Sequence, residues 1–308
     1  MNQAGRLACA AGPFAPLPME LGRLFMPEAL TPLFFTPVYA GLTAEQRLYY
    51  NQLQACCFNE QIVFFESLIG DGVMQALLKE NWPPTFARQL RQFWQEEQAH
   101  SAMFRRLNRS SRPQWYERAD YHFVRFAPPL WAFIRWAARH PRLFPMLLWL
   151  MLLQEERSLH YSSEFLRHRQ QLEPHFVEVY RLHMIDEAGH VRSDLALLDQ
   201  LWPSLSMRSR QRNARWLAWV IREFVSGPKR GQWRVIEALL QAFPALQAQR
   251  CWIREQVVAL EQNETFQLSL YSRRIVPRSF ERFDQWPELQ VLEGAIRGYR
   301  WQGKAQAC

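Results

Sequence analysis

Apolar residues recur along most of the chain at intervals of three and four, the spacing of one face of an α-helix. Prolines and short polar segments divide this pattern into separate stretches, and alternating strand-like runs are hard to find. The pattern therefore predicts an all-α protein. The expected helices span about residues 43–79, 85–107, 131–138, 143–171, 174–202, 206–225, 231–242, 245–272 and 287–300.

The first helix has a clear start signal, because Thr43 is followed three residues later by Gln46, as in a capping box. The stretch before it, residues 1–41, carries six prolines with aromatic residues between them. Proline removes a backbone donor and fixes φ, so this stretch is expected to form an extended arm on the surface. We expect one domain over residues 1–308: this arm, a bundle over about 43–201 and additional helices over about 205–303.

The longest apolar run, residues 143–153, has 11 residues and includes Pro145. A membrane-spanning helix needs roughly 20 such residues, so this run predicts a helix buried on all sides. The N-terminal apolar run is too short for a signal sequence and is broken by Pro13. We therefore expect a cytoplasmic protein without a membrane partner.

Composition adds few constraints to this interpretation. The net charge is +8, yet basic residues form no long run, so a nucleic-acid partner is not expected. The five cysteines are odd in number and contain no C-x-x-C pair, which fits a reducing compartment without a disulfide framework. Cys56 and Cys57 are expected to pack as small apolar side chains.

Two Glu-x-x-His motifs and two mid-helix acids are the candidate chemistry. The motifs are Glu97-x-x-His100 and Glu187-x-x-His190, and His183 lies one helical turn before the second. Residues at i, i+3 and i+7 share a helix face, so each motif directs its carboxylate and imidazole the same way. Further acids, Glu66 and Glu155-Glu156, interrupt apolar helices.

One glutamate from each of two helices, with Glu-x-x-His from each of two others, is the arrangement of di-iron carboxylate bundles. Here single acid and motif alternate along the chain, as two antiparallel helix pairs would place them. Four carboxylates balance two Fe(II) ions, so such a site can be buried without a large net charge. Periodicity leaves open whether Glu155 or Glu156 is the fourth acid.

With these motifs the sequence resembles the p-aminobenzoate N-oxygenase family of di-iron oxygenases, over about residues 25–200. His183 is the discriminating feature, because other carboxylate-bridged oxygenases have two Glu-x-x-His motifs but lack this histidine. The resemblance implies a ferritin-like di-iron four-helix bundle with flanking helices. It places the fourth acid at Glu156, and its implied ligands are Glu66, Glu97, His100, Glu156, His183, Glu187 and His190.

The resemblance further implies an enzyme that holds two iron ions and uses O2 as co-substrate to oxidise an amine nitrogen to hydroxylamine, nitroso or nitro. The expected setting is secondary metabolism. The expected partners are a small amine substrate, free or carrier-bound, an external electron donor and a second copy of the chain. It transfers no catalytic residue beyond the metal ligands.

Two other functions compete with N-oxygenation. A di-iron hydroxylase or desaturase acting on carbon would use the same ligands. A ferritin-like protein would bind metal without turnover, although the helices after residue 205 are more than a bare bundle needs and are expected to wall a substrate pocket.

Overall fold

The structure is a computed structural model that describes residues 18–225 and 229–303. Helices form nearly all the regular structure of these residues, and the only bridge described joins Leu24 to Leu172. The expected all-α fold is confirmed. None of the helices in the described ranges is long and apolar enough to cross a bilayer.

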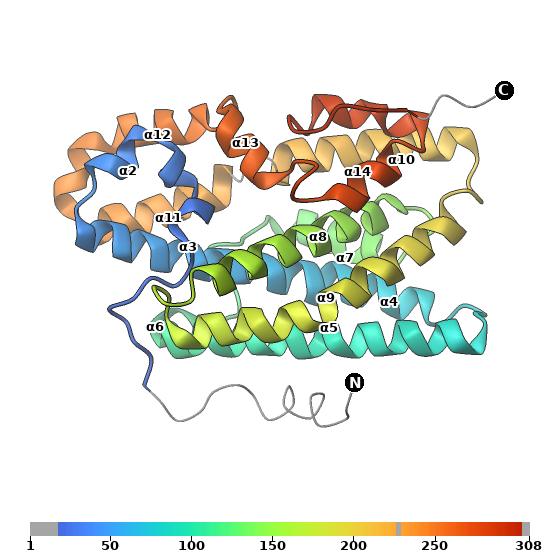
Figure 1. The fold of residues 1–308 in the computed structure, drawn as a ribbon, viewed down its shortest axis with the longest axis horizontal. Coiled ribbons are helices and arrows are strands. Elements are labelled where there is room, and N and C mark those ends of the chain that lie inside the picture. Colours follow the sequence, from blue (N-terminus) through green and yellow to red (C-terminus); the bar gives the residue numbers. More distant parts are fainter. Residues whose placement is uncertain (1–17, 226–228, 304–308) are drawn as a thin grey trace.

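Four long helical segments form the bundle that holds the candidate site (Figure 1). The first segment is one continuous helix in three parts, which confirms the helix expected over residues 43–79. The expected capping box is also present, because Thr43 and Gln46 each accept from the other's backbone N–H. The bundle segments are α3 (Ala44–Phe64) with the π-helical turn η3 (Phe65–Gly70) and α4 (Asp71–Leu77), α5 (Pro84–Ser111), α8 (Met146–Arg167) and α9 (Pro174–Leu201).

The π-helical turn η3 carries Glu66. A π turn inserts one extra residue into an α-helix, so it changes the direction of the side chains that follow, and such turns occur often at functional sites. The hydroxyl of Ser67 donates to the carbonyl of Val63 at 2.6 Å inside this region. Glu66 therefore lies where the helix departs from regular geometry.

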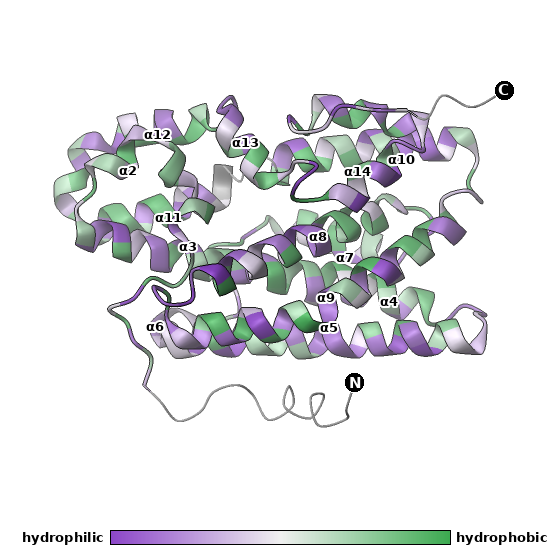
Figure 2. Ribbon diagram, in the orientation of Figure 1, coloured by the Kyte–Doolittle hydropathy of each residue, from purple (hydrophilic) through white to green (hydrophobic). Residues whose placement is uncertain are grey.

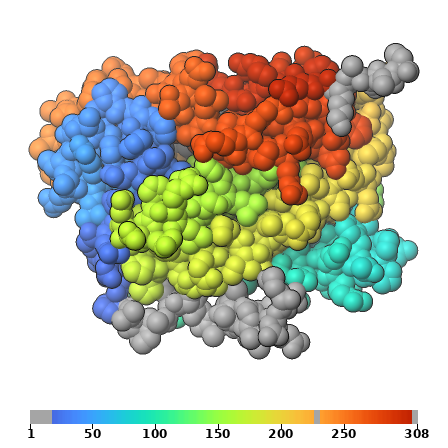
Figure 3. All heavy atoms as spheres, in the orientation of Figure 1, coloured from blue at the N-terminus to red at the C-terminus, as the bar shows by residue number. Residues whose placement is uncertain are grey.

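Shorter elements surround the bundle. In Figure 3 the orange and red residues of the last third lie directly over the green and yellow surface of α8 and α9. These elements are η1 (Glu28–Leu30), η2 (Pro32–Phe35), α2 (Pro37–Gly41), α6 (Pro113–Tyr116), α7 (Pro128–Ala138), α10 (Met207–Val220), η4 (Ile221–Val225), α11 (Lys229–Ala242), η5 (Pro244–Gln249), α12 (Arg250–Ala259), α13 (Glu264–Leu270), α14 (Pro277–Phe283) and η6 (Pro287–Gly294).

Two expectations for these elements were wrong. The helix expected over residues 245–272 is broken after α12, where the side chain of Asn263 accepts from the Phe266 backbone and starts α13. The helix expected after Pro287 is the 3-10 segment η6. Short-range periodicity did not separate these forms because contacts with other elements decide them: η6 packs on α10 and α14, and α12 packs on α11.

The expected extended surface arm is also wrong for residues 18–41, and residues 1–17 lie outside the described residues. The side chains of Phe25, Met26 and Leu33 are completely buried. Asn51 of α3 accepts from the backbone N–H groups of Phe25 and Met26 and donates to the Met26 carbonyl. The aromatic and apolar residues between the prolines thus pack into the core, with their backbone satisfied by a buried amide.

The bundle helices differ in how much of their surface is apolar. The first two turns of α8 are buried all round, as the apolar run predicted, and Trp149 is fully enclosed. In Figure 2 the ribbon of α5 instead alternates between hydrophilic and hydrophobic residues along its length. This alternation fits a helix with one face in the core and one in water.

Candidate metal centre

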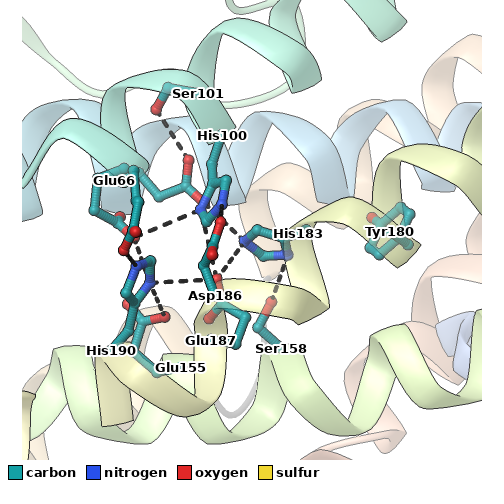
Figure 4. Close-up of polar contacts among 12 residues, drawn as sticks. Glu66, His100, Ser101, Glu155, Ser158, Tyr180, His183, Asp186, Glu187 and His190 are labelled. Carbon is teal, nitrogen blue, oxygen red and sulfur yellow. Dashed lines mark hydrogen bonds and ion pairs between the residues drawn. The ribbon is translucent and has the colours of Figure 1, made fainter. Parts of the chain in front are cut away.

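The polar side chains of the site come from all four segments of the bundle. In Figure 4 the labelled carboxylates and imidazoles converge from the π turn η3, α5, α8 and α9, while Tyr180 lies apart from them. Every imidazole and carboxylate expected from η3, α5 and α9 is buried. A group of buried ionisable residues this dense is costly unless it is paired or binds metal.

The two Glu-x-x-His motifs meet across the α5–α9 contact. Glu97, His100, Glu187 and His190 offer one ligand atom each within 4.8 Å of one another. His190 Nδ1 lies 2.9 Å from Glu97 Oε1 and 3.4 Å from Glu187 Oε1. The i, i+3 spacing thus directs both pairs to one point, as the sequence predicted.

A second group forms beside the first and shares His100 with it. Glu66, His100 and His183 also place ligand atoms within 4.8 Å of one another. His183 Nε2 lies 3.2 Å from Glu66 Oε1 and 2.8 Å from Glu187 Oε1. Two adjoining groups linked by common residues are the geometry that two neighbouring metal ions require.

The outward nitrogen of each histidine has a polar partner. His100 Nε2 lies 3.3 Å from Asp186 Oδ2, and His190 Nε2 lies 3.2 Å from Glu96 Oε2. His183 faces the opposite way, with Nδ1 3.3 Å from the hydroxyl of Ser158. Such partners fix the tautomer of a metal-binding imidazole and leave its other nitrogen free to bind the ion.

Glu156 is the one expected ligand that the structure does not bring to the cluster. Its carboxylate accepts from the backbone N–H groups of Arg278 and Ser279 at 2.9 and 2.7 Å. These groups begin α14, which starts at Pro277 and has no side-chain cap of its own. Glu156 therefore satisfies donors that the helix start leaves unpaired.

Glu155 occupies the place expected for Glu156. Its Oε2 lies 3.8 Å from His190 Nδ1, and its side chain also faces Glu187. The cluster thus consists of seven residues, six from the two groups together with Glu155: Glu66, Glu97, His100, Glu155, His183, Glu187 and His190.

Several buried atoms of the cluster make no hydrogen bond, and this tests whether metal fits. Five buried atoms form no hydrogen bond of regular geometry, although some of them lie in ion-pair contacts: Glu97 Oε1, both carboxylate oxygens of Glu187, and the Nδ1 atoms of His100 and His190. Buried polar atoms are almost always satisfied, so five in one cluster need an explanation. Carboxylate oxygens and imidazole nitrogens suit iron, and cations between them would satisfy all five atoms. The residues present therefore fit a two-metal centre.

Comparison with known families agrees with this geometry. The family described as P-aminobenzoate N-oxygenase AurF matches residues 13–249. The chain belongs to this family. The match confirms the family resemblance inferred from the Glu-x-x-His motifs and supports the ferritin-like helical fold. A search of curated proteins found no significant match to the chain.

Charge coupling is strong in this member of the AurF family. Burial alone would raise the pKa of Glu97 and Glu187, but His190 and His183, respectively, lower both. Burial and the neighbouring Glu97 raise the pKa of Glu66 to about 7. Burial opposes protonation of His183, yet Glu187 and Glu66 outweigh it and raise its pKa to about 10. Carboxylates and imidazoles of the cluster thus shift one another's pKa in the directions expected of opposite charges in contact.

Some residues at the site were missed by sequence reasoning. Asp194 follows His190 by one turn on the same face of α9, and both its carboxylate oxygens are buried without a hydrogen-bond partner. Burial raises the pKa of Asp194 well above its usual range, although the neighbouring His190 opposes the shift. Ser101 donates to Glu66 Oε2 at 3.0 Å. The i+4 spacing after His190 was the available signal for Asp194.

Two cavities of this AurF-family chain adjoin the cluster. A cleft of about 30 Å³ is lined by Glu66, Glu155 and His183 among others, which leaves room for about one small molecule such as water or O2. A larger pocket of about 370 Å³ lies beside it, and its walls combine aromatic rings with the charged side chains of Arg125, Arg157 and Glu223. The two share the side chains of Gln61, Phe65 and Arg157.

Proposed function

We propose that the protein is a di-iron N-oxygenase that uses O2 to oxidise the amine nitrogen of a small molecule. The observation that carries the proposal is the convergence of two Glu-x-x-His pairs with His183 and two further glutamates in a buried site. Two iron ions would supply the electrons and the oxygen-activating chemistry there. Glu66, Glu97, Glu155 and Glu187 would hold them with four negative charges, and His100, His183 and His190 would complete the set.

The protein's own residues would bind the substrate in the larger pocket. This pocket has room for a single aromatic ring with short substituents, and Phe64, Phe65 and Phe126 offer ring surfaces. The cleft at the cluster is too small for such a molecule. The amine would therefore approach the cluster past Gln61, Phe65 and Arg157, which line both cavities.

Arg157 gives the pocket a preference for an anionic substrate. Its side chain is buried, lies over the rings of Phe58, Tyr161 and Tyr271, and donates to the Tyr271 hydroxyl at 2.9 Å. No carboxylate lies within ion-pair distance of it in the part of the chain that the structure describes. A buried cation without a counter-charge attracts an anion. The family's name contains p-aminobenzoate, whose carboxylate would supply that charge.

The test is turnover by the iron-loaded protein. The chain is reconstituted with Fe(II) without oxygen, and O2 and p-aminobenzoate are added with a chemical reductant. The products are then identified by mass spectrometry with ¹⁸O2. The expected result is labelled hydroxylamine, nitroso or nitro product. Label on carbon would favour the hydroxylase alternative, and iron uptake without any product from a panel of arylamines would favour a storage protein.

Arg157→Gln tests the substrate preference separately. The variant should raise KM for p-aminobenzoate by about tenfold or more, because removing a buried charge partner costs over 1 kcal/mol. It should change KM for aniline, which lacks the carboxylate, much less. An equal change for both amines would show that Arg157 acts on the pocket and not on the carboxylate.

A further inference from the structure

Helices α7 and α10 expose a cluster of large aromatic residues. Phe133 of α7 meets Trp216 of α10, with ring centroids 6.0 Å apart, and Trp136 packs beside Phe133. Trp136 and Trp216 are 46% and 38% exposed. We call the surface formed by Phe133, Trp136, Leu143, Phe144 and Trp216 the aromatic patch. Contiguous exposed apolar surface of this kind marks an interaction site.

The aromatic patch lies in two segments that carry arginine and no acid. Residues 121–154 contain four arginines without any Asp or Glu, and residues 200–222 contain five, again without an acid. Arg142 and Arg210 pair with glutamates from elsewhere, and Arg222 with its neighbour Glu223. The exposed side chains beside the patch without a carboxylate partner in the described ranges are Arg135, Arg139, Arg212 and Arg215.

Aromatic residues and arginine are the types enriched at protein–protein interfaces. The positive charge around the patch requires an acidic partner surface. Two copies of this chain joined through the patch would bring their arginines together without acids to balance them. The charge therefore disfavours self-association at this surface.

The patch is one helix away from the candidate metal centre. Helix α7 lies behind α8 in Figure 1 and packs on η3, the π turn that carries Glu66. A Cβ at Gly72 would lie only 2.7 Å from Ala138 Cβ, so the first helix and α7 approach as closely as a glycine allows. The ring of Trp131 in α7 lies 5.6 Å from that of Phe64. A redox partner on α7 would be close to the cluster.

We propose that the aromatic patch docks a small acidic protein that donates single electrons to the metal centre. The inference rests on the proposed function. Oxidising R–NH2 to R–NHOH takes one atom of O2 into the product and releases the other as water, which consumes two electrons and two protons. Two successive encounters with a one-electron carrier supply the electrons, and the solvent supplies the protons. The arginines attract the carrier, and the aromatic side chains pack against its apolar centre.

The experiment uses an acidic [2Fe–2S] ferredoxin, kept reduced by NADPH and its reductase, as the probe. The variant Arg135→Glu/Arg139→Glu/Arg215→Glu is compared with the unaltered chain. Binding of oxidised ferredoxin is measured by calorimetry on both metal-free and iron-loaded protein, and ferredoxin-driven turnover is followed. We expect binding and the ferredoxin-dependent rate to fall by about tenfold or more at low salt and the difference to shrink at high salt.

Two controls define the outcomes. Arg254→Glu makes one charge reversal of the same kind on α12, at the opposite end of the molecule from α10 in Figure 1, and should leave ferredoxin binding unchanged. Dithionite-driven turnover should be equal in all variants, because a small reductant needs no docking surface. Ferredoxin binding that is absent, or equal in the triple variant and the unaltered chain, overturns the proposal. Two other results would also overturn it. One is that the unaltered chain forms a dimer that only the triple variant dissociates, and the other is that the chain binds anionic lipid vesicles but not ferredoxin.

The readouts also separate this inference from the proposed function. If the unaltered chain showed no dithionite-driven turnover, the proposed N-oxygenase function would be rejected, whereas the calorimetric binding result would still stand. Normal dithionite-driven turnover without preferential ferredoxin docking would reject the aromatic patch alone.

Discussion

Glu155 and Glu156 are neighbours in sequence, and their carboxylates point to different parts of the fold. Glu155 Oε2 lies 3.8 Å from His190 Nδ1, whereas Glu156 accepts from the Ser279 backbone at 2.7 Å. Successive residues of a helix point about 100° apart, so only one of them can face the bundle axis. The rotation of α8 about its own axis thus decides which acid reaches the site.

Exchanging each acid for its amide separates the two roles. Loss of a residue that hydrogen-bonds a metal ligand typically weakens metal binding about 10- to 100-fold, and we expect Glu155→Gln to weaken Fe(II) binding at least as much. Glu156→Gln should keep its iron and lose about 1 kcal/mol of stability, because α14 loses a charged acceptor. Iron per chain and the unfolding midpoint measure both effects. Loss of iron from the Glu156 variant alone would reverse the assignment.

This pair of glutamates also shows how far the sequence leads. The Glu-x-x-His motifs were predictable because their i, i+3 spacing is a property of any helix. The choice between Glu155 and Glu156 was not, because contacts more than 100 residues away set the rotation of α8. Arg157 bonds Tyr271, 114 residues on, and Glu156 bonds Ser279, 123 residues on. The buried course of residues 18–41 was missed for the same reason, since it depends on Asn51 in another element.

The contact between Asp186 and His100 provides a test of the outer partners. Asp186 Oδ2 lies 3.3 Å from the outward nitrogen of His100 and does not reach the cluster itself. Asp186→Asn keeps the shape but removes the negative charge that favours the metal-binding tautomer. We expect Fe(II) affinity to fall about 10- to 100-fold, measured by competition with a chelator.

A matched control for this variant lies on the same helix. Glu178 is partly exposed on α9 and pairs with Arg181 in the described contacts. Glu178→Gln makes the same chemical change away from the site and should leave Fe(II) affinity unaltered. An equal loss in both variants would mean that the charge of α9, and not the His100 contact, controls affinity.

The cysteines should differ sharply in reactivity. Burial raises the pKa of Cys56 to about 12 and that of Cys57 further, and both side chains are enclosed. At pH 8 the thiolate of Cys56 would then be about one part in ten thousand. Iodoacetamide should therefore modify the exposed Cys251 in the folded protein and spare both buried thiols. Peptide mapping measures this, with urea-unfolded protein as control, and rapid labelling of Cys56 in the folded state would contradict its burial.

Glu60 links the stability of the protein to pH without involving the cluster. Its buried carboxylate accepts from the Tyr116 hydroxyl and from the backbone of His122, Phe123 and Val124. Burial raises the pKa of Glu60 above its usual 4.5, although these hydrogen bonds oppose the shift. A carboxyl whose pKa is raised by folding contributes stability that is present below about 4.5 and is lost as pH rises through the folded value. The urea midpoint of unfolding should therefore fall between pH 4.5 and pH 8 in the unaltered chain, relative to that of Glu60→Gln. The hydrogen bonds that the variant weakens lower its midpoint by an amount that does not depend on pH. A difference between the two midpoints that does not change with pH would show that Glu60 titrates alike in the folded and unfolded states.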